Sequence, residues 1–93
     1  MSKRITIRIP APLRSYAGEA AELHVQAGTV RQALAAAGER HQLMIRRVLT
    51  RDGELRPYVN LFLGDTDVRT LAALDTPTAD GDVISIMPSV AGG

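Results

Sequence analysis

The residues best placed to do chemistry are the last two, Gly92 and Gly93, after which the sequence ends in a main-chain carboxylate. Neither glycine carries a Cβ, so the final peptide can enter a narrow cleft and its carboxylate can closely approach another group. A terminus built in this way is typical of a group that reacts with a second molecule. We therefore expect the reactive group to be the terminus itself, carried on a flexible tail.

The remaining side chains form no catalytic or metal-binding pattern. Neither His24 nor His41 stands at metal-ligand spacing with another histidine or a carboxylate. Asp65 and Asp67 could hold a divalent cation, but acidic residues beside glycine are typical of turns. The serines have no neighbouring histidine or lysine motif that would activate them. We expect no metal site, no bound cofactor and no catalysis by the chain alone.

The composition narrows the function further. A chain of 93 residues is one small domain. It contains no cysteine, so any sulfur chemistry needs a group other than a side-chain thiol. The net charge of +1 is too small to indicate nucleic-acid binding. Because no apolar run could span a bilayer and the first residues do not resemble a signal peptide, we expect no membrane association and a cytoplasmic location.

One charged cluster remains open to two interpretations. Arg46, Arg47, Arg51 and Arg56 lie close together in the sequence, without the interleaved aromatic residues that stack on bases. They could form a solvated helix face or a patch that binds a partner.

The elements that must position the tail follow from hydrophobic periodicity. Alternating apolar and polar residues predict strands over residues 4–8, 22–26, 58–63 and 82–87. Helical spacing predicts a helix over residues 30–37, capped by Thr29 and ended by Gly38, and a shorter one over 42–49. In the shorter helix we expect Leu43, either Met44 or Ile45, and Val48 to face the core. Turns or loops are expected at residues 13–18 and 64–67, with a bridging strand or a helical turn at 68–74.

This order of elements predicts an α+β fold with a small mixed sheet and one main helix packed on one face. It is the β-grasp arrangement of ubiquitin. The expected organisation is a β-grasp domain over residues 1–87 and a reactive tail over residues 88–93.

Several motifs resemble those of one family along nearly the whole chain. They are Leu13-Arg14, Gly28-Thr29-Val30, Val59-Asn60, Leu71, Leu74-Asp75-Thr76-Pro77, Asp80-Gly81-Asp82-Val83, Ile86, Pro88 and Val90-Ala91-Gly92-Gly93. Together they resemble the ThiS/MoaD family of ubiquitin-like sulfur carriers. Residues 58–62, with Asp65 and Asp67-Val68-Arg69, look most like the CysO branch, which supplies sulfur for cysteine synthesis. Gly64 and Ser89 depart from the residues that relatives often carry.

The resemblance implies a reaction at Gly93. An adenylyltransferase of the ubiquitin-activating type would convert its carboxylate to an acyl-adenylate, consuming ATP with Mg²⁺. Sulfur from a sulfurtransferase or desulfurase would then give a thiocarboxylate for a sulfur-accepting synthase, with cysteine biosynthesis favoured. The alternatives are the small subunit of molybdopterin synthase, a sulfur donor for a thiolated secondary metabolite or a thiazole, and a ubiquitin-like protein modifier.

The same reading gives a set of partner-binding residues. In the tail, Gly92 and Gly93 would let the chain thread into the partners' active sites, while Val90 and Pro88 anchor its root. Ala91 lies between them and is counted among the partner-binding residues. Ordering the tail costs entropy, so a further docking patch is expected. The candidates are Tyr58, Phe62 and Met87 on the sheet face away from the helix. In the alternative reading, Phe62 completes the core and Met87 fills a gap.

Overall fold

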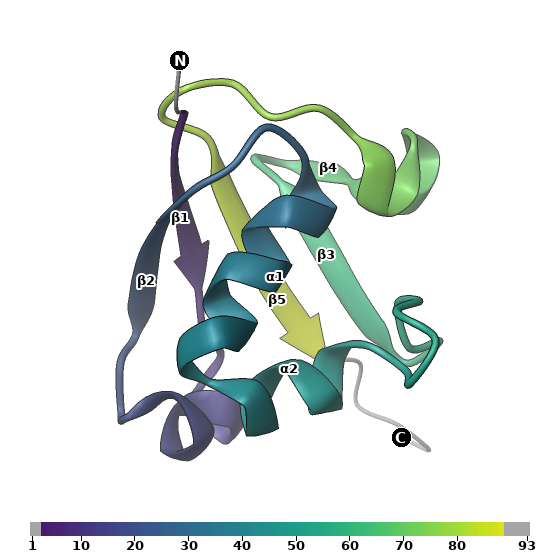
Figure 1. Ribbon diagram of the computed structural model, residues 1–93. Coiled ribbons are helices and arrows are strands. Elements are labelled where there is room, and N and C mark those ends of the chain that lie inside the picture. Colours follow the sequence, from purple (N-terminus) through teal and green to yellow (C-terminus); the bar gives the residue numbers. More distant parts are fainter. Residues whose placement is uncertain (1–2, 89–93) are drawn as a thin grey trace.

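The computed structural model describes residues 3–88, which form a mixed sheet with its helices on one face (Figure 1). The elements are β1 (Arg4–Arg8), β2 (Glu22–Gln26), α1 (Val30–Arg40), α2 (Gln42–Val48), β3 (Val59–Leu63), β4 (Thr66–Asp67) and β5 (Val83–Pro88). Three 3₁₀ segments cover Ala11–Ala17, Val68–Thr70 and Ala73–Asp75.

The strand order β2-β1-β5-β3-β4 places β5 in the centre of the sheet. β5 is parallel to β1, whereas the other pairs are antiparallel, so the sheet is mixed as predicted. Parallel neighbours need a long crossover connection, and the helices lie within the segment that joins β1 to β5. This is the β-grasp fold.

α1 begins where the sequence predicts and ends later. Thr29 caps it, because its Oγ1 accepts a hydrogen bond of 3.1 Å from the backbone N–H of Gln32. The predicted buried stripe is present and consists of Val30, Ala33, Leu34 and Ala37. The prediction that Gly38 ends the helix is wrong, since the helix continues to Arg40.

Gly38 serves the contact between the two helices. A Cβ built on this residue would lie 3.2 Å from Cγ1 of Ile45 in α2, which is closer than an ordinary van der Waals contact. The missing side chain therefore lets α2 pack closely against α1. Glycine has a lower helix propensity than most other residues, and the close contact between the two helices offsets this cost.

α2 turns inward all but one of the residues expected to face the core. Met44 and Val48 are buried and Ile45 packs against the core. Leu43 is 60% exposed, so the prediction that it faces the core is wrong. In a helix of only seven residues the buried stripe is narrow, and Leu43 precedes Met44 on the solvent side.

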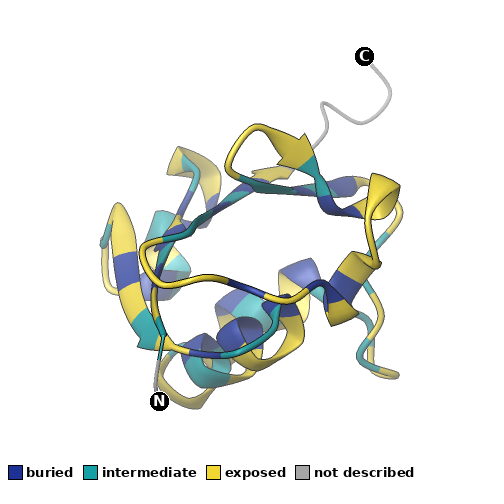
Figure 2. Cartoon of the chain, turned by 90° about the horizontal axis from the view of Figure 1, so that it is seen from above, coloured by how far each residue is buried: buried dark blue, intermediate teal, exposed yellow. Residues whose placement is uncertain are grey.

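The core lies between the helices and one face of the sheet, where buried residues alternate with half-buried or exposed ones along the strands (Figure 2). Ile5 and Ile7 of β1 and Leu61 of β3 point into this layer, as the alternation predicts. Most of the segment expected as a turn at residues 13–18 belongs to the 3₁₀ helix Ala11–Ala17, and Gly18 caps its end. Its Leu13 and Ala17 are buried and close one end of the core.

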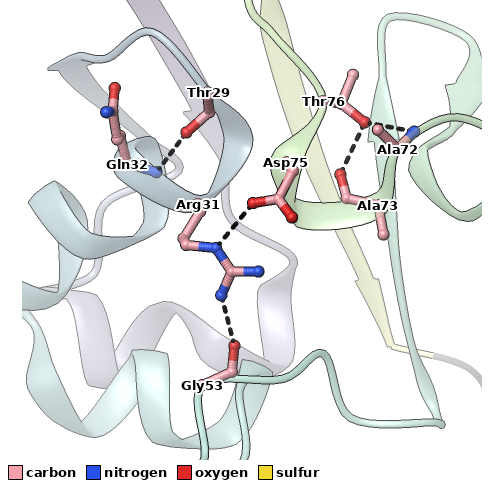
Figure 3. A network of polar contacts seen from close by, with 8 residues as sticks. All are labelled: Thr29, Arg31, Gln32, Gly53, Ala72, Ala73, Asp75 and Thr76. Carbon is pink, nitrogen blue, oxygen red and sulfur yellow. Dashed lines mark hydrogen bonds and ion pairs between the residues drawn. The ribbon is translucent and has the colours of Figure 1, made fainter.

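A polar network ties three distant segments together (Figure 3). Arg31 of α1 donates from Nε to Oδ1 of Asp75 at 3.1 Å and from Nη1 to the carbonyl oxygen of Gly53 at 3.1 Å. Buried Thr76 donates to the carbonyl oxygen of Ala73 and accepts from the N–H of Ala72. The network fixes both the loop before β5 and the turn that follows α2.

Candidate functional site

The candidate site is the end of β5, where the sheet leads into the C-terminal residues. Pro88 pairs with Val59 and Met87 pairs with Asn60, so the strand extends one residue beyond the expected boundary at 87. The expected reactive and tail residues Val90, Ala91, Gly92 and Gly93 lie outside the described residues. The β3–β5 pairing thus fixes the point at which the C-terminal segment begins.

Two of the three expected docking residues share the outer face of the sheet. Met87 is 51% exposed and lies opposite Asn60, and Phe62 lies opposite Ser85. Residues two apart on a strand point to the same side, so Phe62, Asn60 and Met87 face away from the helices. Phe62 is half-buried and is not among the side chains that pack against the core. This arrangement favours an outer-face position over the core alternative for Phe62.

Tyr58 lies elsewhere. β3 begins at Val59, so the prediction that Tyr58 is the first residue of this strand is wrong. Tyr58 belongs to the turn before the strand, is 47% exposed, and lines a hollow together with Leu13 and Tyr16. Because it precedes the paired residues, the alternation of the strand does not determine where its ring points.

Arg69 orders the polar part of the outer face, and sequence reasoning assigned it no role. Its Nη1 donates to Oδ1 of Asn60 at 3.0 Å, and its Nη2 donates to the carbonyl oxygen of Arg56 at 2.9 Å. Asp67 accepts from the backbone N–H of Arg69 at 2.9 Å. Asn60, the cross-strand neighbour of Met87, is therefore held in place from the 3₁₀ segment Val68–Thr70 that follows β4.

A hollow of about 520 Å³ opens beside Met87 on the other side of β5. Its lining residues are Arg8, Ile9, Pro10, Pro12, Arg14, Ala21, Ser85, Ile86 and Met87. Arg14 is fixed there by a 3.0 Å hydrogen bond from its Nε to the carbonyl oxygen of Ile9. Sequence reasoning missed this hollow because it forms only when β5 pairs in parallel with β1.

Three of the histidine and aspartate side chains contact nearby polar groups of the chain. His24 is exposed, with its Nδ1 3.2 Å from Oγ1 of Thr6. Asp80 accepts from the N–H of Arg4, and Asp82 accepts from the N–H of Ala79, both at 2.8 Å. Across residues 3–88 no three or more His, Asp or Glu side chains are grouped so as to hold a metal ion. In the same part of the chain, none of the helices has the length and apolar character needed to cross a bilayer.

Known proteins resemble this chain over nearly its whole length. The model of the ThiS family matches residues 7–93. A putative sulfur carrier protein of Archaeoglobus fulgidus is 35% identical over 89 residues, which are 96% of this chain and 98% of that protein. The sulfur carrier protein CysO of Mycobacterium tuberculosis H37Rv is 31% identical over 91 residues, covering 96% and 98% of the two chains.

A solved structure with the same fold supports the likeness to sulfur carrier proteins. A chain in the crystal structure of the BexX/CysO complex of Amycolatopsis orientalis superimposes with a TM-score of 0.88 and 31% identity, covering 96% of this chain and 99% of the other. The match includes the β-grasp sheet and its helices, and the family model extends to the final glycine. The chain therefore belongs to the ThiS family of sulfur carrier proteins.

Proposed function

We propose that this protein carries sulfur as a thiocarboxylate on Gly93 and acts as a co-substrate of partner enzymes rather than as an enzyme. An adenylyltransferase of the ubiquitin-activating type joins the carboxylate to AMP, with ATP consumed and Mg²⁺ required in that partner and pyrophosphate released. A sulfurtransferase or desulfurase supplies sulfide or a persulfide, which attacks the carbonyl carbon and displaces AMP. Sulfide gives the thiocarboxylate directly, whereas a persulfide gives an acyl disulfide whose S–S bond is then cleaved by a second thiol. A carboxylate is a poor acyl donor until one oxygen becomes part of a leaving group, which is why activation comes first.

The observation that carries the proposal is the position of β5. The family's terminal Gly-Gly follows the central strand of the sheet, whose last residue Pro88 is paired with Val59. A rigid sheet can present Val90, Ala91 and the two glycines to a partner while the domain itself stays outside the partner's active site. Glycine at the last two positions allows the carboxylate to approach the reacting atoms closely.

The favoured acceptor is an enzyme of cysteine biosynthesis. The support is the likeness to CysO, at 31% identity over nearly the whole of both chains. The BexX/CysO structure supports partner enzymes of sulfur transfer as a class. In this proposal the thiocarboxylate sulfur forms a bond to the acceptor's substrate and displaces a leaving group from it. Water then cleaves the bond between the sulfur and the Gly93 carbonyl carbon, which regenerates the carboxylate for another cycle.

Docking uses the outer face beside the terminus. Met87 and Phe62 offer apolar surface, and Arg69 holds Asn60 between them. Pro88 restricts the backbone at the root of the tail, and Tyr58 lies in the turn before the paired strand β3. Surface contacts of this kind offset the entropy lost when the tail is ordered.

The experiment compares the full chain with a variant that lacks Gly93 and with one extended by a single alanine. With the organism's own adenylyltransferase and ATP, we expect pyrophosphate release that depends on the full chain and is lost with both variants. Circular dichroism should show the same fold for all three, because residues 3–88 are self-contained. Equal pyrophosphate release from the full chain and from the variant lacking Gly93 would contradict the proposal. Conjugates to lysine side chains, absent without Gly93, would indicate a protein modifier instead.

A further inference from the structure

The four arginines that cluster in the sequence also meet in space. Arg46 and Arg47 lie on α2, Arg51 lies in the following turn, and Arg56 lies in the segment before β3. Two hollows, of about 630 and 500 Å³, adjoin each other here, because Arg46 and Arg56 line both of them. Together the two hollows form a surface that we call the arginine groove.

The charged side chains that line the arginine groove are all positive. None of the residues that line the two hollows is acidic. Within residues 3–88 the ion pair found joins Arg31 to Asp75, outside this groove. The nearby Glu54 lines a different hollow, together with Arg31 and Arg69. The charge of the groove is therefore available to a partner.

Apolar side chains accompany this charge. Leu43, at 60% exposure, and Tyr58, at 47%, are two of the most exposed large hydrophobic residues of the described chain. Both line the smaller hollow, where the guanidinium of Arg47 stacks on the ring of Tyr16 at 4.1 Å from its centroid. A surface that combines cations with exposed aliphatic and aromatic groups fits an acidic segment containing an apolar side chain.

The groove is held in shape before any partner binds. Arg56 donates from Nε to the carbonyl oxygen of Arg46 at 2.9 Å, and this bond ties the segment before β3 to α2. The turn that carries Arg51 is closed by a 2.7 Å bond from the N–H of Thr50 to the carbonyl oxygen of Glu54. Arg31 holds the same turn through Gly53 (Figure 3). A preformed surface loses little entropy on binding.

The position of the arginine groove indicates which partner binds there. Val59 lines the smaller hollow and pairs with Pro88, so the groove adjoins the point from which the C-terminal segment begins. Gly93 is five residues beyond Pro88, a reach of at most about 18 Å, so an enzyme that holds Gly93 in its active site lies close to this end of the sheet. Every proposed use of Gly93 begins with its adenylation. The adenylyltransferase is therefore the partner that we expect to bind the arginine groove.

We propose that the arginine groove docks an acidic segment, bearing an apolar side chain among its carboxylates, of the adenylyltransferase that activates Gly93. This inference rests on the proposed function. Opposite charges steer the encounter of the two proteins and hold their relative orientation, while the apolar group fills the space beside Leu43. The chemistry of adenylation uses the terminus and no arginine of the groove.

The test is the charge reversal R46E/R51E, with R4E/R40E as the matched control. Both double variants make the same change in net charge, and Arg40 ends α1 much as Arg46 lies in the last turn of α2. Arg4 and Arg40 line a separate hollow beside β2. In steady-state adenylation we expect R46E/R51E to raise the KM for the carrier about tenfold or more with kcat unchanged, and to weaken the salt dependence of KM. The control should match the parent chain.

Three other outcomes of this experiment would overturn the docking inference. If the parent chain is adenylated and both double variants share its KM and its salt dependence, the docking inference is overturned while the proposed function stands. If KM falls in R46E/R51E, the groove hinders activation by binding another group, such as the chain's own terminus, and the inference is again overturned. If the parent chain is not adenylated at all, both proposals fail. R46Q/R51Q should give an intermediate KM, which separates loss of attraction from the introduced repulsion.

Discussion

At the scale of single residues, a few backbone conformations fix the turns that lead into the last strand. Gly81 adopts φ +89° in the turn before β5, and its N–H donates to the carbonyl oxygen of Arg4 at 2.8 Å. Ala73 adopts φ +52°, a left-handed conformation that costs a residue with a Cβ about 1–2 kcal/mol. An Asp-Gly pair such as Asp80-Gly81 is typical of a turn of this kind, whereas nothing in the sequence distinguishes Ala73.

These two positions predict stability changes of opposite sign. Gly81→Ala should lower the free energy of unfolding by about 1–2 kcal/mol, because a Cβ at this position touches nothing and only the backbone is strained. Ala73→Gly should raise it by up to about 1 kcal/mol, since Ala73 is exposed and loses no packing. Urea unfolding of both variants measures the two changes. A Gly81→Ala variant as stable as the parent would show that the turn does not need a positive φ.

At the scale of elements, local rules predicted the strands and the start of α1, while contacts between elements decided the rest. Alternation identified Ile5 and Ile7 as buried, and Thr29 as a cap, because these depend on neighbours in sequence. Gly38 was misread as a helix end because its role depends on Ile45 across the helix pair. Leu43 was misplaced because a short helix has no clear periodicity.

The contact between α1 and α2 predicts a large effect of side-chain size at Gly38. Gly38→Leu should lower the free energy of unfolding by about 1–3 kcal/mol, because its Cβ would already crowd Ile45 and the added carbons would push the helices apart. Ala35→Leu is the matched control, since Ala35 is exposed one turn earlier on the same helix and should change stability by less than about 0.5 kcal/mol. Equal urea midpoints for the two variants would show that the helices do not pack closely at Gly38.

At the scale of the whole molecule, the topology assembles surfaces that no single segment contains. The hollow beside Met87 needs the parallel pairing of β5 with β1, and the arginine groove needs α2, the following turn and the residues before β3. The sequence showed that the arginines are clustered but left open whether they form a solvated face. Their common hollows and the exposed Leu43 became visible only in the folded chain.

The whole molecule also explains how a chain without cysteine can take part in sulfur chemistry. The family match extends to Gly93, and the last described strand lies in the centre of the sheet. In the proposed function the sulfur is bonded to the terminal carbonyl carbon, so no side-chain thiol is needed. The domain contributes stability, the point at which the terminus emerges, and the surfaces that partners recognise.

The most direct test of this account is the intact mass of the protein after incubation with its adenylyltransferase, ATP, Mg²⁺ and sulfide. The account predicts a species heavier by about 16 Da, because one oxygen is replaced by sulfur. Fragmentation should place the change on Gly93, and omitting ATP should abolish it. An unchanged mass under conditions in which the enzyme forms the acyl-adenylate, or a mass change located elsewhere in the chain, would contradict the account.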